Sequence, residues 1–488
     1  MSASPFHSRS ALLVTALGAL IVTASPRLGA QTSAPTATPT QTATPTQTTV
    51  VTAPASPTVT QQSAPSDPEV RIHQLEDRIV ALEKAEAKTK AAAATAPTVT
   101  ANRDGLNVRS VDGDFQFRLR GYVQSDARFF GAGGTAVPGS STFLLRRVRP
   151  IFEATAYKYF GVRLMPDFGD GKVVLYDAYV DAKPTSAFNV RLGKFKPPIG
   201  LERIQSATDV RFVERGLPTS LVPNRDVGVQ LFGDIAGARV AYALGAFDGV
   251  PDAAISDGDL SNGKDVVGRL FFRPFATNAD LPDLGFGVAG STGTEQGSVS
   301  APALGSYKTT GQLPLFKYRN DGTAPNTVLA EGRRTRVSPQ GYLYAGPFGV
   351  LAEYVRSTQN VRRATNAAEL TTQAWQLSTG WVLTGERESF TSISPAHPLD
   401  GSRAGGLGAL ELVARYGVLT TDPGAFPLFA DPNTQPRRAR AAGVGLNWRL
   451  TRGILFATDY ERTQLQGPAE ATTRSTEHAV LTRLQVGF

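Results

Sequence analysis

Basic side chains are concentrated in two segments of the chain, where their spacing would allow them to bind an anion. Arg147 and Arg149 are two positions apart, so on an extended strand both point to the same face. Guanidinium and ammonium groups that line a narrow, poorly solvated passage favour anions over cations. A glycine- and proline-rich segment farther along the chain holds four more candidates for such pore-lining, anion-binding positions: Lys194, Lys196, Arg203 and Arg225.

The position of two of these lysines conflicts with a simple strand. Lys194 and Lys196 have the same parity as Val190 and Leu192, which places them on the apolar face of an extended segment. A lysine on a lipid-facing position at mid-membrane costs about 2–4 kcal/mol. The strand has therefore ended before these residues, or a bulge has reset its register.

A second interpretation assigns the basic residues to the fold or the surface. Inside a barrel they pair with neighbouring acids, here Asp177, Asp181 or Glu202, and at a membrane rim they bind lipid phosphates. Over residues 194–226 six bases accompany four acids, so the excess of positive charge is small. We interpret a further set as loop or rim charges: Arg333, Arg334, Arg336, Arg362, Arg363, Arg437 and Arg438.

Residues suited to catalysis are sparse. The four histidines are His7, His73, His397 and His478, and none has a nucleophile and an acid in a recognisable triad order. No zinc-protease, Walker or dinucleotide-binding motif is present. The absence of cysteine excludes disulfides, a thiolate nucleophile and cysteine-based zinc sites. We therefore expect no enzymatic activity, no metal site and no cofactor.

The first 30 residues have the pattern of an export signal. Arg9 precedes the apolar run 11–24, and small residues allow cleavage after Ala24 or Ala30. The alternative is a membrane anchor, but the apolar run is shorter than the ~20 residues that a spanning helix needs. We predict a signal peptide over residues 1–30 and an exported protein.

Three short regions follow the predicted signal peptide. Residues 31–69 are rich in Thr, Pro, Ala, Ser and Gln, which predicts a disordered linker. Residues 70–94 predict a helix with a coiled-coil seam, and residues 95–104 a second linker. A single surface helix is the alternative, and a tether to the cell wall is a further possible role. The seam consists of Ile72, Leu75, Ile79 and Leu82, at alternating spacings of three and four.

From residue 105 to the end, the hydrophobic pattern has a period of two, which indicates β-strands. Along residues 443–450, for example, Val444 and Leu446 alternate with Gly445 and Asn447. A soluble β-sandwich would show the same alternation, with its faces inverted. Export, the length of the strand-like segments and the final strand favour a membrane barrel. We therefore predict an all-β fold, a transmembrane antiparallel barrel over residues 105–488.

A β-structure in lipid must close, because backbone groups that face hydrocarbon have no water partner. At about 24 residues per strand with its connection, the stretch 105–488 holds about 16 strands. A barrel of that size leaves an aqueous channel. The last strand, 480–488, places Val480, Leu484, Val486 and the terminal Phe488 on one face. An aromatic C-terminal residue resembles the signal that the outer-membrane assembly machinery recognises.

The barrel segment resembles the phosphate-selective porin O and P family. The resemblance is carried by motifs in the same order along the chain, over almost the whole of residues 105–488. It implies a homotrimer of 16-stranded barrels, each with its own pore and a loop that folds inward to form a constriction lined by basic residues. The motifs are Arg146–Arg149, Asp177–Val180, Gly193–Glu202, Phe212–Pro218, Pro223–Arg225, Trp381–Glu386, Glu411–Tyr416 and Gly445–Trp448.

Together these observations predict an outer-membrane porin for passive diffusion of small anions, with phosphate or polyphosphate as candidate solutes. The alternatives are a non-selective diffusion porin and a barrel that acts mainly as a structural tether. The formal net charge of +8 agrees with anionic partners, and no nucleic-acid motif accompanies it. The expected partners are small inorganic anions, outer-membrane lipid, the assembly machinery through Phe488, and further copies of the chain in a homotrimer.

Overall fold

The computed structural model describes residues 67–102, 104–131, 139–258, 262–278, 280–399, 406–467 and 475–488. The predicted signal peptide and the predicted linker up to residue 66 lie outside these ranges. Within them, no helix combines the length and the apolar character that a membrane span requires.

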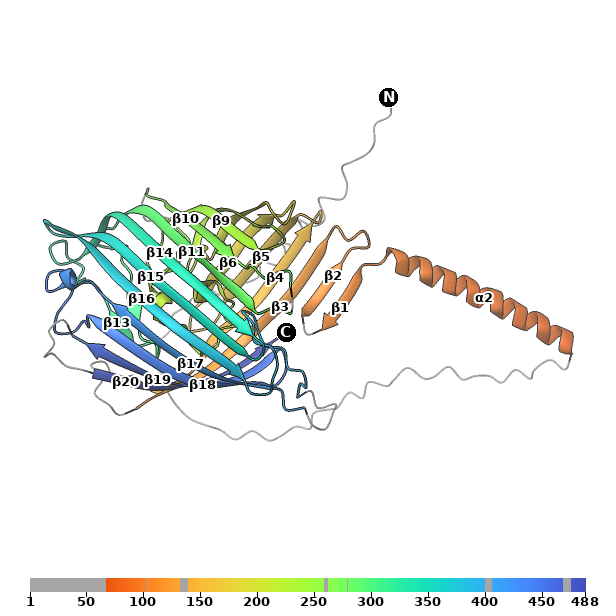
Figure 1. Ribbon diagram of the computed structural model, residues 1–488. Helices are drawn as coiled ribbons and strands as arrows, with labels where there is room; N and C mark the ends of the chain where they lie inside the picture. Colours follow the sequence, from red (N-terminus) through yellow and green to blue (C-terminus); the bar gives the residue numbers. More distant parts are fainter. Residues whose placement is uncertain are drawn as a thin grey trace, which may run out of the picture. The chain divides into compact units, whose positions relative to one another are not determined.

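Sixteen antiparallel strands of the described chain form one closed barrel, as predicted (Figure 1). Each strand pairs with its neighbour in the chain, and β20 pairs with β3 from Ala479↔Phe130 to Gly487↔Tyr122. The strands are β3 Gln116–Phe130, β4 Thr142–Ala156, β5 Phe160–Asp167, β6 Val174–Ala182, β7 Asn189–Phe195, β8 Asp226–Ile235, β9 Val240–Phe247, β10 Asp265–Phe272, β11 Asp283–Gln296, β14 Leu329–Ala345, β15 Phe348–Arg363, β16 Asn366–Val382, β17 Ala409–Thr420, β18 Arg438–Arg449, β19 Ile454–Gln466 and β20 Ser475–Gly487.

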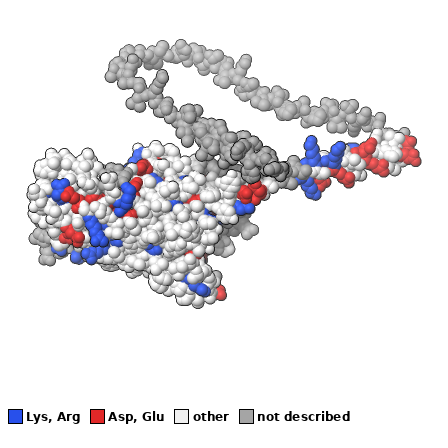
Figure 2. All heavy atoms as spheres, turned by 90° about the horizontal axis from the view of Figure 1, so that it is seen from above, with Lys and Arg blue, Asp and Glu red and all other residues white. Residues whose placement is uncertain are grey.

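The two faces of the wall have the polarity expected of a membrane barrel. On β16 the outward Trp375, Leu377 and Trp381 are each more than 40% exposed, whereas the inward Gln376 and Ser378 are buried. A soluble protein would bury the large apolar side chains and expose the polar ones. In Figure 2 the charged side chains visible on the barrel gather mainly toward its ends, and most of the wall between them is uncharged.

A short hairpin extends the sheet before the barrel begins. β1 (Thr98–Asn102) pairs with β2 (Gly105–Arg109), and β2 pairs with the start of β3. The region predicted as the linker 95–104 therefore contains a strand, because Thr98, Val99 and Thr100 are β-branched or polar residues suited to an exposed edge. The first strand of the closed barrel is β3.

The only long helix among the described residues is α2, Pro68–Thr95. Its predicted seam is fully uncovered: Ile72, Leu75, Ile79 and Leu82 are between 53% and 67% exposed. The structure thus contains the predicted helix, and its role as a coiled coil remains a prediction.

Connections at the two ends of the barrel differ in length. At the end that holds residue 488, hereafter the terminal end, most turns are short, such as 157–159, 346–347 and 450–453. At the opposite end, hereafter the loop end, long segments connect the strands, among them 196–225 and 297–328. One long turn, 383–408, departs from this pattern at the terminal end.

Candidate functional site

The segment between β7 and β8, residues 196–225, lies inside the barrel and is hereafter the inward segment. It contains the short helix α3 (Leu201–Ile204) and the 3-10 turn η1 (Leu217–Leu221). Ile199, Leu201 and Leu221 have no exposed surface, and Leu217 packs in the same apolar cluster as Val355 and Ala374 of the barrel wall. The apolar residues of this segment therefore dock it onto the β15–β16 side of the wall.

Carboxylates on β15 and β19 hold the backbone of the inward segment. Glu353 on β15 accepts hydrogen bonds from the amides of Leu201 at 2.7 Å and Glu202 at 3.3 Å. Asp459 on β19 accepts from the amide of Val213 at 2.5 Å. Buried backbone donors need such partners, and a carboxylate is the strongest acceptor available. The acids of this wall thus serve to position the segment.

Glycines on β18 make room for these acids. A Cβ atom at Gly445 would lie 2.2 Å from a carboxylate oxygen of Asp459, and one at Gly443 would lie 2.6 Å from the carboxylate of Glu461. Glu461 in turn accepts from Arg415 at 2.5 Å, and Arg415 also donates to the carbonyl of Glu214 in the inward segment at 2.7 Å. These two glycines therefore have a packing role next to the segment.

Segments from both ends of the barrel contact the inward segment or the nearby wall. Arg211 donates to Glu388 of the long turn 383–408 at 2.7 Å. From the loop end, the segment 297–328 reaches β20, where the Thr309 hydroxyl donates to Glu477 at 3.0 Å. These segments therefore occupy part of the β15–β20 half of the interior.

Two cavities remain on the opposite side, along the wall formed by β3–β10. The terminal cavity measures about 1010 Å³ and includes Arg452 and Phe488 in its lining. The loop cavity measures about 400 Å³ and includes Lys172 and Lys308. The described residues that line both cavities are Arg149, Lys196, Ala207 and Arg225. We take these four as the junction between the two cavities.

Two arginines and a tyrosine form one side of the junction. The Arg149 guanidinium lies 3.9 Å from the ring centroid of Tyr176, and that of Arg225 lies 5.0 Å from the same ring. Arg149 donates to Asp167 at 2.8 Å and Arg225 to Asp177 at 2.8 Å. Both cations are thus paired with an acid and held against an aromatic face.

Three cations of the inward segment have a different environment. The ammonium of Lys196 donates to the carbonyls of Ile204 at 3.2 Å and Gln205 at 2.5 Å. Arg215 donates to the carbonyls of Glu202 at 3.0 Å and Gln205 at 2.8 Å, and Arg203 donates to the carbonyl of Thr219. No carboxylate of the described chain lies within ion-pair distance of Lys196, Arg203 or Arg215. Carbonyls orient these side chains, and no ion pair of the described chain neutralises them.

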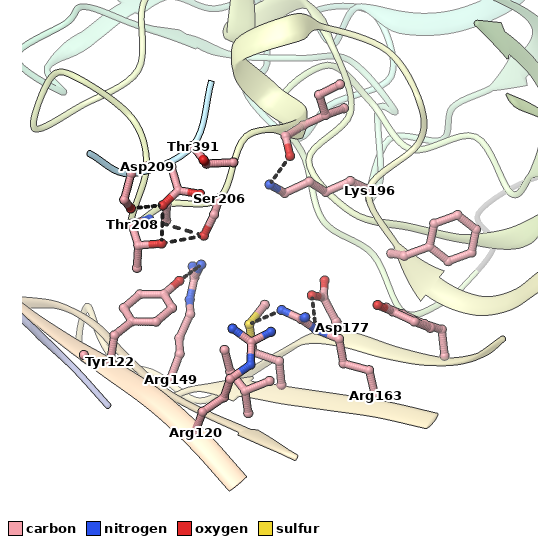
Figure 3. Close-up of a pocket in the computed structure, with 18 of the residues that line it drawn as sticks. Arg120, Tyr122, Arg149, Arg163, Asp177, Lys196, Ser206, Thr208, Asp209 and Thr391 are labelled. Atoms are coloured by element: carbon pink, nitrogen blue, oxygen red, sulfur yellow. Dashed lines mark hydrogen bonds and ion pairs between the residues drawn. The ribbon is translucent and has the colours of Figure 1, made fainter. Parts of the chain in front are cut away.

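Figure 3 shows how the terminal cavity is lined. Arg120, Arg149 and Arg163 extend from the strands on one side, and Ser206 and Thr208 of the inward segment lie on the other. The described lining of this cavity contains nine basic and four acidic residues, and the loop cavity has the same numbers. Both cavities therefore carry a net positive charge.

The structure brings five of the six predicted residues to these cavities. Arg149, Lys196 and Arg225 line both, and Arg147 and Arg203 line the loop cavity. Arg147 is occupied by a hydrogen bond to Gln124 at 2.6 Å and lies 3.7 Å from Glu214.

Lys194 lines neither cavity. Strand β7 continues without a bulge to Phe195, so Lys194 keeps the outward parity of Leu192. The residue is 3% exposed, and its ammonium forms an ion pair with Asp257 of the β9–β10 connection. Neither of the two predicted explanations for the position of Lys194, an ended strand or a bulge, applies to this residue. Lys196 does lie beyond the strand end.

Two β-bulges bring lining residues that the alternation does not predict. Arg146 has no partner on β3, because Gln124 pairs with Arg147 and Ser125 with Leu145. A bulge between Met165 and Pro166 likewise leaves Tyr176 unpaired on β6. Each bulge turns two successive residues toward the lumen. Strict alternation from Val174 to Val180 would place Tyr176 on the outer face, whereas the bulge turns it toward the loop cavity.

Two arginines interpreted as rim charges are instead buried. Arg334 and Arg336 on β14 are 2% and 1% exposed. Both donate to Asp265, at 2.9 and 2.8 Å. Their parity on β14, alternating with Thr335 and Val337, was the signal that could have identified them as inward residues.

Comparison with known proteins agrees with this architecture. A family model described as phosphate-selective porin O and P matches residues 117–488. Porin O of Pseudomonas aeruginosa is 24% identical over 436 residues, which covers 80% of this chain and 93% of that protein. Similar solved structures include the outer membrane channel DcaP of Acinetobacter baumannii, with 9% identity, coverage of 80% of this chain and 99% of that chain, and a TM-score of 0.49. OmpT of Vibrio cholerae has 10% identity, coverage of 77% and 98%, and a TM-score of 0.47.

The residues and the comparisons lead to one class of protein. The barrel has an apolar outer wall, a polar interior and charged cavities that share the basic residues Arg149, Lys196 and Arg225 in their linings. The family model covers nearly the whole barrel. This protein is an outer-membrane channel, not an enzyme, and it belongs to the phosphate-selective porin O and P family.

Proposed function

We propose that this channel passes small anions in preference to cations, and that phosphate-bearing solutes are among them. The observation that carries the proposal is the set of Lys196, Arg203 and Arg215, whose described partners are backbone carbonyls. Arg203 is buried and Lys196 and Arg215 are partly buried, and a poorly solvated charge without an ion-pair partner favours a mobile ion of opposite sign, because a lower dielectric strengthens their attraction. A cation at the junction would meet repulsion.

The experiment is a zero-current potential measurement on the purified protein in a planar bilayer with a KCl gradient. The expected result is a potential whose sign indicates that chloride carries more current than potassium. Equal permeabilities would support the alternative, a non-selective diffusion porin, for which the pairs Arg149–Asp167 and Arg225–Asp177 are the favouring observation. A preference for potassium would contradict the proposal.

Phosphate specificity requires a second measurement on the same channel. The family is described as phosphate-selective, and guanidinium groups bind phosphate oxygens well. Inorganic phosphate should therefore reduce the chloride current at concentrations far below that of chloride. Sulfate is the matched control, because it is another tetrahedral oxyanion. Block that needs phosphate at concentrations comparable to chloride would limit the proposal to general anion preference.

We further propose that the protein is an exported homotrimer. Trimeric assembly is what the family resemblance implies, and the exposed seam of α2 offers a surface for self-association. The terminal Phe488 pairs through its backbone with Gly121, at 3.0 Å from its amide and 2.9 Å to its carbonyl oxygen, and its ring is 56% exposed. An accessible aromatic ring at the end of the last strand suits recognition by the assembly machinery.

A further inference from the structure

The outer wall carries an unusual set of charges near the loop end of β15–β19. A row of aromatic side chains crosses the outer face of these strands near their middle and consists of Tyr354, Trp375, Tyr416 and Tyr460. Tyr354 is paired with Trp375, and the rings of Trp375 and Tyr416 lie 5.7 Å apart.

Arginines lie immediately beyond this row, toward the loop end. Arg356 is two residues beyond Tyr354 on β15, and Arg462 is two residues beyond Tyr460 on β19. Arg440 lies on β18 between them. We call Arg356, Arg440 and Arg462 the outer arginine belt. All three face outward, because the residues next to them in sequence, such as Ser357, Ala441 and Thr463, are buried and face the lumen.

The belt has no acidic partner in the described part of the chain. Every acidic residue of β17–β20 points inward: Glu411, Asp459, Glu461 and Glu477 are at most 2% exposed. None of the three arginines makes an ion pair or a side-chain hydrogen bond with a described residue. The arginines are therefore available to a ligand outside the barrel.

Two members of the belt are close enough to share one anionic group. Arg462 is directly opposite Ala442, two residues from Arg440, so the two arginines are diagonal neighbours at about 7–8 Å. On the other side Arg462 is opposite His478, whose ring is hydrogen-bonded to the Tyr460 hydroxyl at 2.7 Å. Two like charges this close repel each other unless an anion lies between them.

The belt is confined to one part of the wall. On β3–β11 the only outward basic residue of a described strand is Lys194, which is buried and paired with Asp257. At the terminal end of β15–β19 the outward residues are uncharged, for example Phe348, Trp381 and Phe456. The positive charge of the described outer wall is thus restricted to the loop-end half of one side of the barrel.

We infer that the outer arginine belt binds the phosphate groups of a phosphorylated glycolipid in the leaflet at the loop end. Longer loops face the outside of an outer membrane, so this leaflet is the external one. Guanidinium groups bind phosphate in a bidentate manner, and the aromatic row below them contacts the acyl region. The site is separate from the pore, and its occupant is independent of the ion preference proposed above.

The test is binding of lipid A, a bis-phosphorylated glycolipid, to the full-length protein in detergent micelles. The dephosphorylated glycolipid is the comparison ligand. Arg440→Gln combined with Arg462→Gln should weaken lipid A binding about 25-fold, at roughly fivefold for each arginine near a lipid headgroup, and leave the dephosphorylated lipid unaffected. The matched control, Arg109→Gln with Arg239→Gln, removes two exposed arginines near the terminal end and should leave both affinities unchanged.

Several outcomes would overturn the inference. They are equal affinity of the native protein for the two glycolipids, an unaltered affinity of the double variant, or displacement of lipid A by inorganic phosphate at equal concentration. A smaller oligomer in the double variant would assign the belt to a subunit interface instead. Heat-dependent gel mobility shows whether the double variant is folded. If the double variant does not fold, Arg462→Gln alone is tested in its place. An unchanged single-channel conductance separates this result from any failure of the pore proposal.

Discussion

At the scale of single residues, the acidic and the basic side chains of the interior have different hydrogen-bond partners. The acids Glu353 and Asp459 accept from backbone amides of the inward segment, so their charge is used to hold that segment in place. Lys196 and Arg215 donate to backbone carbonyls instead. The described linings of the two cavities that meet at the junction each contain nine basic and four acidic residues, so the net charge around the junction is positive.

Two lysines in this region form a matched pair for testing the effect of the positive charge around the junction on ion preference. Lys196→Gln should lower the chloride-to-potassium permeability ratio about two- to fivefold, since a unit charge at ~4 Å is worth about 1 kcal/mol in water. Lys194→Gln removes the same charge two residues away, on the outer side of β7, and should leave the ratio unchanged. Zero-current potentials of the two variants provide the comparison, and equal effects would exclude Lys196 from the pore lining.

Glu214 is the acid whose removal should destabilise the barrel most clearly. It accepts from Arg128 at 3.0 Å and Arg146 at 2.6 Å, and lies within 4.0 Å of Arg147 and Arg483. Glu214→Gln leaves Arg128, Arg146 and Arg147 without this counter-ion, whereas Arg483 keeps Asp126; the loss costs on the order of 3–5 kcal/mol. The temperature of the heat-induced gel-mobility change should fall accordingly.

An exposed ion pair supplies the control for that variant. Glu331 pairs with Arg362 at the loop end, with side chains 45% and 41% exposed. Glu331→Gln should change stability by no more than about 1 kcal/mol. If the two variants unfold at the same temperature, the arginine cluster around Glu214 is not the stabilising feature described above.

At the scale of elements, the period-two pattern predicted the strands and most of their faces. It could not predict the bulges at Arg146 and Tyr176, because one extra residue leaves no mark on a short alternating pattern. It also could not place the inward segment, whose position depends on partners such as Glu353 and Asp459 that are far away in the sequence. The basic residues of that segment were predicted from their composition and from the family resemblance.

The burial of Lys194 illustrates the same limit. Parity correctly predicted that its side chain points away from the lumen, and the cost of a lysine in lipid then argued against a regular strand. The charge of Lys194 is instead paired with Asp257, which belongs to the separate β9–β10 connection. Contacts between distant segments decide such cases, and a local pattern contains no information about them.

The helix α2 permits a direct test of self-association, because the chain has no cysteine. Ile79→Cys introduces one thiol in the exposed seam, and mild oxidation of the full-length protein should yield a disulfide-linked dimer. Asp77→Cys places the thiol on the opposite side of a heptad and should cross-link much less. Equal cross-linking of the two variants on a non-reducing gel would favour the single surface helix.

At the scale of the whole molecule, the outer wall is adapted to lipid. Val444 is in the middle of β18 and 53% exposed, so Val444→Lys should cost about 2–4 kcal/mol in the free energy of unfolding from lipid vesicles. Ala367 lies at the rim of β16, and Ala367→Lys should cost at most about 1 kcal/mol. Denaturant titration measures both. Similar small costs for both variants would mean that β18 does not face hydrocarbon.

The prediction of about 16 strands depended on chain length and strand spacing, which are properties of the whole chain and insensitive to local errors. No comparable property of the whole chain predicted that the two cavities lie to one side of the barrel interior. It follows from the docking of the inward segment onto the β15–β16 side through residues such as Leu217 and Val355. Architecture was therefore more predictable than the path of the pore.

The seam between β3 and β20 has a consequence for how the protein is assembled. It joins the first and last strands of the barrel, so its hydrogen bonds are the most non-local in the molecule and are expected to form late in folding. Until they form, both edges of the sheet are open and prone to wrong pairing. Since the inward segment is enclosed by the finished wall, it has to be threaded into place before this last closure. A chain truncated before β20 would accordingly expose two unpaired edges and an unprotected lumen, and would be a substrate for proteolysis.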